Sequence, residues 1–316
     1  MTTRPGGRDA VSPPADTTLS APPLSGVWPR QLRHTLLYLA ATLLLLLFCG
    51  PIVWMVGQSL RGIDEVIANP YDLVPRHFTL GAFSSALGGG SDGTIALAQN
   101  FLNSTLYAGV SVCGNVLLGV PAGYAFARLR FPLRRLLFAL VVVAMVVPTA
   151  AIVIPLFVVI RVAAIGGGGL GWLNTYQGLI LPTAVTGLTI VLVRQFLRGI
   201  PRELDEAAQI DGCGVYRTFL YVILPLSGPA VASVATLTFL ARWDDYLWPS
   251  VAAVTPDMFT LQVGLRSIEG NGAYAQQWPL LMACCVLAAL PIVVMYVVLQ
   301  PLFDRGLASL GTGWEW

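Results

Sequence analysis

Apolar residues in this chain come in long blocks that are separated by shorter polar stretches. Each block is near the ~20 residues that an α-helix needs to cross the hydrocarbon core of a bilayer. The blocks lie at about residues 34–56, 98–121, 136–160, 176–193, 225–241 and 279–300. We therefore predict an all-α membrane protein with six transmembrane helices.

Three prolines fall inside these blocks. Pro148 and Pro155 lie in the third block and Pro291 lies in the sixth. Proline removes a backbone N–H and its ring clashes with the preceding turn, so each position predicts a kink. Neighbouring helices can satisfy the backbone groups that a kink frees.

The composition supports the membrane assignment. Hydrophobic residues make up 56% of the chain and charged residues only 11%, and the mean hydropathy is +0.73. A soluble domain carries about 25% charged residues. Membrane lipid is therefore the expected surroundings, and the net charge of +2 gives no indication of a nucleic-acid partner.

The arginines predict the orientation, because the chain contains no lysine. With an even number of spans, both termini lie on the same side of the membrane. Most arginines fall in the four stretches that would share this side, namely the N-terminal tail, the 128–135 loop, the 194–224 loop and the C-terminal tail. Positively charged loops favour the cytoplasm. Both termini and the 194–224 loop are therefore predicted to be cytoplasmic.

A polar insert, Glu206-Ala207-Ala208-Gln209-Ile210-Asp211-Gly212, lies between the fourth and fifth blocks. Charged groups avoid the membrane core, so the insert must lie in water beside the bilayer. Pro201 suits a first helical turn, and acidic residues follow it. Gly212 suits the helix end. Leu204, Ala207, Ala208 and Asp211 share one face of this helix, which predicts a short helix that docks into a groove of another protein.

This insert resembles the EAA loop of bacterial ABC-importer permeases, which reads Glu-Ala-Ala, then Gly, then Ile-x-Leu-Pro further along. Val222 stands at the isoleucine position. The resemblance implies an ABC type I importer permease in the bacterial cytoplasmic (inner) membrane, whose loop at about 194–224 seats in a cleft of a separate ATPase subunit. The matching positions are Glu206, Ala207, Ala208, Gly212, Leu224 and Pro225. Together with Asp211, which shares the face of the predicted helix, they are the implied ATPase-coupling residues.

Further motifs resemble the carbohydrate-uptake branch of this family, in particular the second permease of maltose-type systems. They are the loop from Ser59 to Thr79, Asn103-Ser104, Tyr124 to Arg128, Trp243 to Pro249, and Phe259-Thr260-Leu261. The implied partners are a homologous permease subunit, two ATPase subunits and an extracytoplasmic sugar-binding (lipo)protein.

The predicted domain organisation has three parts. Residues 1–30 are rich in Pro, Gly, Ser and Thr and predict a disordered cytoplasmic tail. Residues 31–310 form the six-helix permease domain. Residues 311–316 form a short C-terminal tail, for which we make no functional assignment.

The candidate substrate-pathway residues are Asn103, Trp243, Asp244 and Asp245. Aromatic rings stack on the apolar faces of sugars, while amides and carboxylates bind hydroxyl groups. The same residues also suit other roles, because Trp favours the membrane interface and Asn can hydrogen-bond between helices. In maltose-type systems, moreover, most sugar contacts come from the partner permease, so both interpretations stay open.

Several function classes find little support in the residues. A phosphate-binding lysine is missing, so no cofactor is expected in this chain, and ATP and Mg²⁺ are expected in the partner ATPase subunits. No catalytic residues are predicted and no metal site, because there are only two histidines and the adjacent Cys284 and Cys285 lack metal-ligand spacing. An ion-coupled secondary carrier is an alternative, although no Asp or Glu lies inside the blocks. A permease for a non-sugar solute, such as a glycerophosphodiester, is another. The predicted function is a permease subunit of an ATP-driven sugar importer.

Overall fold

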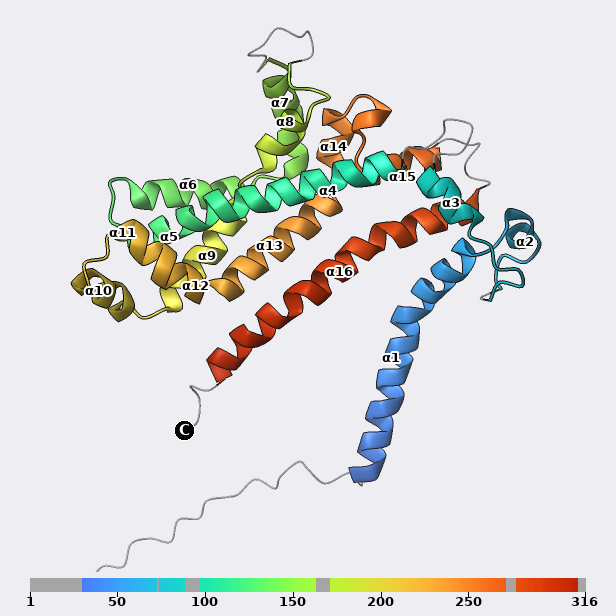
Figure 1. Ribbon diagram of the computed structural model, residues 1–316, viewed down its shortest axis with the longest axis horizontal. Coiled ribbons are helices and arrows are strands. Elements are labelled where there is room, and N and C mark those ends of the chain that lie inside the picture. The colour runs from blue at the N-terminus through green and yellow to red at the C-terminus, as the bar shows by residue number, and fades with distance from the viewer. Residues whose placement is uncertain (1–29, 73, 89–96, 163–170, 271–276, 312–316) are drawn as a thin grey trace, which may run out of the picture. The chain divides into compact units, whose positions relative to one another are not determined.

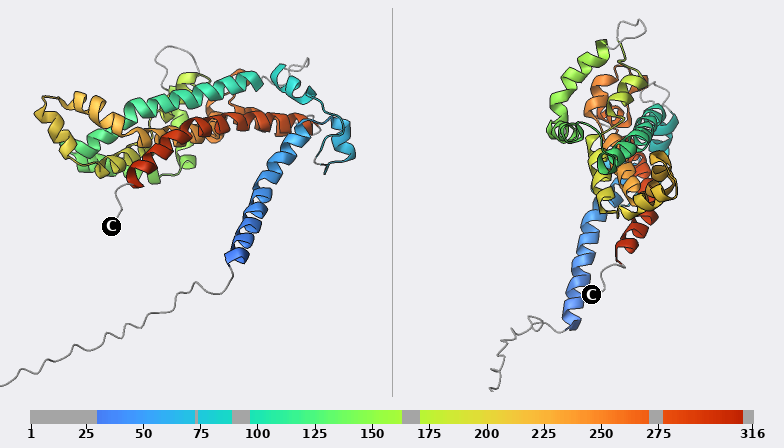
Figure 2. Two further views of the ribbon diagram at one scale, coloured as in Figure 1. Left: turned by 60° about the horizontal axis from the view of Figure 1, so that its bottom comes forward. Right: turned by 90° about the vertical axis from the view of Figure 1, so that its left-hand side faces the viewer.

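The computed structural model describes residues 30–72, 74–88, 97–162, 171–270 and 277–311 (Figure 1). The predicted tails at 1–30 and 311–316 therefore lie outside the described residues, apart from one residue of each. Helices are the only regular elements within these ranges, as two further views also show (Figure 2). The prediction of an all-α protein is confirmed for this part of the chain.

The chain divides into two compact units, residues 1–51 and 52–316. The described part of the first unit is the beginning of α1 (Arg30–Ser59). Its leucines are largely exposed, for example Leu43 at 68% and Leu47 at 66%. A continuous apolar surface of this kind is stable in lipid rather than in water.

The second unit contains the end of α1 and all other elements. In chain order they are α2 (Ile63–Ala68), α3 (Gly81–Gly88), α4 (Leu97–Gly114), the π-helix η1 (Asn115–Gly119), α5 (Val120–Arg128), α6 (Arg134–Val146), α7 (Thr149–Val162), α8 (Tyr176–Ile180), the 3₁₀-helix η2 (Leu181–Thr183), α9 (Gly187–Gly199), α10 (Glu203–Ile210), α11 (Val215–Thr218), the π-helix η3 (Phe219–Ile223), α12 (Leu224–Leu226), α13 (Gly228–Trp243), α14 (Leu247–Ala252), the 3₁₀-helix η4 (Pro256–Met258), α15 (Leu261–Gly270) and α16 (Trp278–Gly311).

Within the described residues, four continuous helical stretches are long and apolar enough to cross a membrane. They are His34–Ser59, Leu97–Arg128, Tyr176–Gly199 and Trp278–Val298. Two bent helix pairs pass the same test together, Arg134–Val146 with Thr149–Val162 and Val215–Leu226 with Gly228–Trp243. The structure therefore has four such helices, or up to six if each bent pair is one span.

The bends differ from the expected pattern of kinks. At Val147 and Pro148 the third block is not merely kinked, because α6 and α7 meet at 105°. Val147 is extended, with ψ of 121°, which is the conformation that a following proline imposes. The helices α7 and α16 continue through Pro155 and Pro291, and the kinks expected at these two residues stay predictions.

The fifth block also begins earlier than predicted. Its apolar helix starts at Val215, inside the expected loop, and bends by 77° at Ser227 before α13. Gly228 and Pro229 open α13, and the residue before a proline avoids the interior of a helix. The predicted loop at 194–224 is therefore largely helical in its second half.

Close packing between α4–η1–α5 and α9 organises the centre of the second unit. A Cβ atom added at Gly119 would lie 2.6 Å from Thr189 Cγ2, and one at Gly123 would lie 2.7 Å from Val193 Cβ. The glycines thus permit an approach that no larger residue allows. The GxxxG spacing of Gly119 and Gly123 forms this helix–helix contact.

The buried side chain of Asn115 lies in the same contact. Its Oδ1 atom accepts hydrogen bonds from Thr186 N (2.9 Å), Thr186 Oγ1 (3.1 Å) and Thr189 Oγ1 (2.7 Å). Its Nδ2 atom donates to Ser111 O at 3.0 Å. Every polar atom of this amide thus has a partner, as a buried amide in a membrane helix requires.

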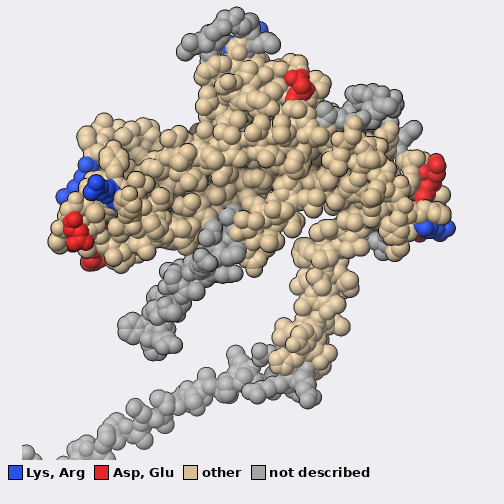
Figure 3. All heavy atoms as spheres, in the orientation of Figure 1, with Lys and Arg blue, Asp and Glu red and all other residues tan. Residues whose placement is uncertain are grey.

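Charged groups lie away from the long helices on the face shown in Figure 3. They gather over α10 and its neighbouring loops, over α2 and near α14, and the helical surface between these places shows no charge. This distribution is the one that a bilayer demands, because a charge in the hydrocarbon region is costly.

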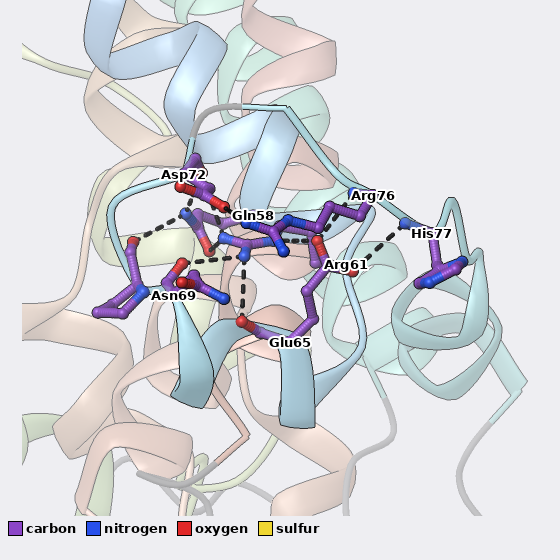
Figure 4. Close-up of polar contacts among 8 residues, drawn as sticks. Gln58, Arg61, Glu65, Asn69, Asp72, Arg76 and His77 are labelled. Carbon is purple, nitrogen blue, oxygen red and sulfur yellow. Dashed lines mark hydrogen bonds and ion pairs between the residues drawn. The ribbon is translucent and has the colours of Figure 1, made fainter.

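The loop after α1 is held by Arg61, which is 1% exposed (Figure 4). Its guanidinium donates to Glu65 Oε1 (3.0 Å), to Gln58 Oε1 (3.2 Å) and to the carbonyl oxygens of Asp72 (3.2 Å), Glu65 (3.0 Å) and Asn69 (2.9 Å). A buried guanidinium is stable when its donors are satisfied in this way. The segment from Gln58 to Asp72 is therefore a compact structure that is built around one side chain.

Candidate functional site

The predicted docking helix is present as α10 (Glu203–Ile210). Glu203, Asp205 and Glu206 lie in its first turn, where the helix dipole favours negative charge. Pro201 precedes the N-cap residue Arg202 and therefore lies just before the helix. The prediction that it lies in the first turn is wrong.

Gly212 ends α10 as predicted. Its φ of +80° is a left-handed conformation that side chains disfavour. The N–H of Gly212 donates to Gln209 O at 3.0 Å, and the N–H of Cys213 donates to Ala208 O at 2.8 Å. These bonds satisfy carbonyl groups that a helix end otherwise leaves without partners.

The two alanines of the docking motif face different surroundings. Ala208 is 6% exposed and packs inside this chain, whereas Ala207 is exposed. Leu204 is 40% exposed and Ile210 is 88% exposed. Of the predicted docking face, Leu204, Ala207 and Asp211 are accessible, and Ile210 adds an apolar side chain that the sequence analysis did not include.

The inner surface of α10 is attached to the end of α5. Arg128 Nε lies 3.2 Å from Asp205 Oδ2, and these two side chains are only 7% and 14% exposed. A cavity of 320 Å³ adjoins the pair and is lined also by Arg130, Arg202 and Gln209. Asp205 and Arg128 are far apart in the sequence, and no local pattern of residues predicts that they meet.

The last two motif residues lie in α12, away from α10. Leu224 is partly buried and packs against a cluster of buried residues that includes Val193, Leu197 and Phe219. Pro225 is exposed and stands in the first turn of its helix, where proline is tolerated. Both residues lie where the fifth apolar block was predicted to begin, at about residue 225.

Asn103 and Trp243, two of the predicted substrate-pathway residues, make contacts within the chain. Asn103 is buried, donates to the carbonyl oxygens of Asp257 (2.8 Å) and Phe259 (2.9 Å), and accepts from Tyr176 Oη (2.7 Å). Trp243 is 1% exposed, and its Nε1 donates to Ala288 O at 3.0 Å. In this conformation both side chains connect segments of this chain, and their contact with a substrate stays a prediction.

Asp244 and Asp245 follow the end of α13 and differ in surroundings. Asp245 Oδ2 accepts from Tyr107 Oη (2.8 Å) and from Arg242 Nη1 (3.2 Å). Asp244 is exposed, and partial desolvation raises its pKa. Asp244 is therefore the one of the two that is accessible to another molecule.

A cavity of 420 Å³ lies between the bend of α6 and α7, the start of α9 and the end of α13. Thr149, Thr186, Thr189, Thr238 and Arg242 line it together with apolar side chains. None of the four predicted pathway residues lines this cavity, although Arg242 precedes them in the chain. Hydroxyl groups beside apolar surface suit a polyhydroxylated solute.

Within the described residues, no group of three or more His, Cys, Asp or Glu side chains is arranged to hold a metal ion.

Comparison with known proteins defines the class to which these features belong. Residues 116–309 match the family described as binding-protein-dependent transport system inner membrane component. The chain belongs to this family, and it is a transport subunit of an inner membrane. The matched region includes α10, η3 and the bent helices.

Relatives with assigned transport systems are similar over most of the chain. The sulfoquinovosyl glycerol transport system permease protein of Agrobacterium fabrum is 31% identical over 298 residues, which are 93% of this chain and 98% of that protein. The arabinooligosaccharides transport system permease protein of Halalkalibacterium halodurans is 35% identical over 212 residues, which are 67% of this chain and 72% of that protein. The sn-glycerol-3-phosphate transport system permease protein of Yersinia pestis is 35% identical over 208 residues, which are 66% of this chain and 72% of that protein.

A solved structure shares the fold. It is a bacterial ABC transporter involved in the import of the acidic polysaccharide alginate, and one of its chains matches with a TM-score of 0.73 at 22% identity. The match covers 88% of this chain and 99% of that one. The fold is thus that of an ABC-importer permease.

Proposed function

We propose that this chain is the membrane-spanning permease subunit of an ATP-driven sugar importer. The observation that carries the proposal is family membership together with relatives whose names specify sugars or sugar derivatives. The exposed face of α10 supports it, because an accessible apolar surface on a short helix suits docking to another subunit.

The complex would contain a homologous permease, two ATPase subunits and an extracytoplasmic sugar-binding protein. ATP and Mg²⁺ would bind to the ATPase subunits, and this chain would hold no cofactor. Each bent pair would be one span, which gives six spans in residues 31–310 with both termini in the cytoplasm. The arginines near α10 support this orientation.

In this arrangement, closure of the ATPase subunits would displace α10 and switch the bundle between inward-facing and outward-facing states. Ala207 would permit close contact with the ATPase cleft, Glu206 would be oriented by helix-end and cross-interface contacts, and Gly212 would provide the turn. The 420 Å³ cavity with its threonine hydroxyls would form part of the solute path.

The Yersinia relative favours a second candidate solute class, namely glycerol phosphates and their diesters. An ion-coupled carrier finds less support, because no Asp or Glu lies within the candidate spans that the structure describes.

One experiment separates these possibilities. The complex is co-purified, and ATP hydrolysis is measured with the binding protein and a panel of neutral sugars, acidic sugars, glycerol phosphates, amino acids and peptides. Stimulation by a carbohydrate is the expected result. Stimulation by amino acids or peptides and by no carbohydrate would refute the substrate class, and gradient-driven uptake by this chain alone would favour the secondary carrier.

The coupling role has its own test. Ala207→Trp places a bulky side chain on the exposed face of α10 and should abolish transport while the protein remains inserted and folded. Normal uptake by this variant would refute docking through that face.

A further inference from the structure

A single side chain, Arg128, contacts three elements at the base of the docking helix. It is the last residue of α5. Its Nη2 atom donates to Ile200 O at 2.7 Å, at the end of α9, and its Nε lies 3.2 Å from Asp205 Oδ2 in the first turn of α10. One guanidinium therefore joins two membrane helices to the helix that carries the docking motif.

The burial of this ion pair makes it resistant to separation. The side chains of Arg128 and Asp205 are 7% and 14% exposed. An exposed ion pair is easily replaced by water, but buried partners that separate leave two charges without compensation. The Ile200 carbonyl group adds to the attraction, because the end of a helix carries partial negative charge. A displacement of α10 therefore draws α5 and α9 with it.

A second contact lies one helical turn before Arg128. The ring of Tyr124 packs on Phe219 of η3, with ring centroids 4.9 Å apart. Asp205 lies in the first turn of α10 and Phe219 follows α10 in the chain, so α5 contacts both the start of the docking helix and the segment that comes after it. The contact between the rings of Tyr124 and Phe219 restrains the position of η3, and the ion pair restrains the first turn of α10.

We propose that Arg128 is a positioning residue for coupling, which transmits the displacement of α10 to the ends of the spans Leu97–Arg128 and Tyr176–Gly199. This inference rests on the proposed function, in which α10 seats on an ATPase subunit. Arginine suits the role better than lysine, because Nε of its planar fork faces the Asp205 carboxylate while Nη2 donates to Ile200 O, whereas an ammonium is a single compact donor group.

The test measures two displacements in the complete complex, reconstituted in nanodiscs with its partner permease and ATPase subunits. Spin labels are placed at the exposed positions Gln209 on α10 and Gln195 on α9, each in a background without native cysteines. The distance of each label to a second label at the exposed Tyr246 is measured by electron-electron double resonance. Nucleotide-free complexes are compared with complexes that are trapped by ATP, Mg²⁺ and vanadate.

In the unsubstituted complex, both distances should change on trapping. With Arg128→Gln the change at Gln209 should persist and the change at Gln195 should be lost. The matched control is Arg198→Gln, which removes an exposed arginine from α9 and should leave both changes intact. Persistence of the change at Gln209 together with loss of the change at Gln195 distinguishes a coupling contact from a general loss of packing.

The outcomes are distinguishable. If both distances change in Arg128→Gln as they do in the unsubstituted complex, the inference is overturned and the proposed function stands. If neither distance changes in the unsubstituted complex, the proposed coupling through α10 fails, and the inference fails with it. If Arg128→Gln does not co-purify with the ATPase subunits, the same distances are measured in Arg128→Lys. This variant keeps the positive charge but cannot contact Asp205 and the Ile200 carbonyl group at the same time. A reduced change at Gln195 then supports the inference, and an undiminished change overturns it.

Discussion

Substitution of Gly123 by alanine tests the close packing between α5 and α9. The added Cβ atom would lie 2.7 Å from both Cβ and Cγ1 of Val193. Carbon atoms in contact are ~3.5–4.0 Å apart, so the shortfall is about 1 Å. Val193 is fully buried, and a valine in a helix has one strongly preferred rotamer. The side chain cannot turn away, and the helices must separate.

The size of the effect follows from two opposing terms. Overpacking of this kind costs about 1–3 kcal/mol. Replacement of glycine by alanine inside a helix recovers roughly 0.5–1 kcal/mol of backbone entropy. Gly123→Ala should therefore destabilise the protein by about 0.5–2 kcal/mol. Gly109 in α4 is the matched control, because nothing lies within 4 Å of a Cβ atom there, and Gly109→Ala should be neutral or stabilising.

The assay is reversible unfolding of the purified protein in mixed micelles, titrated with dodecyl sulfate and followed by tryptophan fluorescence. The free energies of unfolding of the two alanine variants are compared under the same conditions. The gain in backbone entropy is common to both variants, so we expect Gly123→Ala to be the less stable by the overpacking term alone, about 1–3 kcal/mol. Equal stability of the two variants would refute the packing argument.

Three further outcomes follow from buried or ionised side chains. Asn115→Leu leaves three donors of Thr186 and Thr189 without their acceptor. At ~0.6 kcal/mol for each membrane hydrogen bond, the free energy of unfolding should fall by about 2 kcal/mol. An unchanged unfolding midpoint would contradict this. The N–H of Arg76 and other donors lower the pKa of Glu65, so the contribution of Glu65 to stability is present at neutral pH and lost as pH falls below about 4. The protection of residues 58–72 against hydrogen exchange, corrected for the intrinsic pH dependence of exchange, should therefore fall in acid, and Glu65→Gln should remove that dependence. Trp248→Phe removes a 3.0 Å hydrogen bond to the Leu179 carbonyl group and should cost about 1 kcal/mol; thermal melts that coincide with the unsubstituted protein would argue against a structural role for that bond.

The hydrophobic blocks predicted most of the helices, because solubility in lipid is a local property that each segment carries by itself. The helix stop at Gly212 was equally local, since its conformation depends on the residue type. The early start of the fifth helix at Val215 had a signal in Gly228-Pro229, which predicts a new helix start rather than the middle of a span.

Other features depend on contacts between distant segments. The burial of Ala208 and the pairing of Arg128 with Asp205 follow from the way in which α10 packs on α5. The pattern of apolar residues in the sequence does not show which of the two adjacent alanines, Ala207 or Ala208, is buried within the chain. The rings of Trp243 and Phe239 stack 5.4 Å apart, which explains why a residue with suitable sugar chemistry is fully covered in this conformation.

The structure around Arg61 has a consequence for the order of folding during membrane insertion. All of its hydrogen-bond partners lie between Gln58 and Asp72, so its contacts span few residues of sequence. Short loops close quickly and at low entropic cost. In the orientation proposed above, this segment can therefore fold as soon as the first span has delivered it across the membrane, before the later helices are synthesised. It would then be the first part of the second unit to reach its final structure.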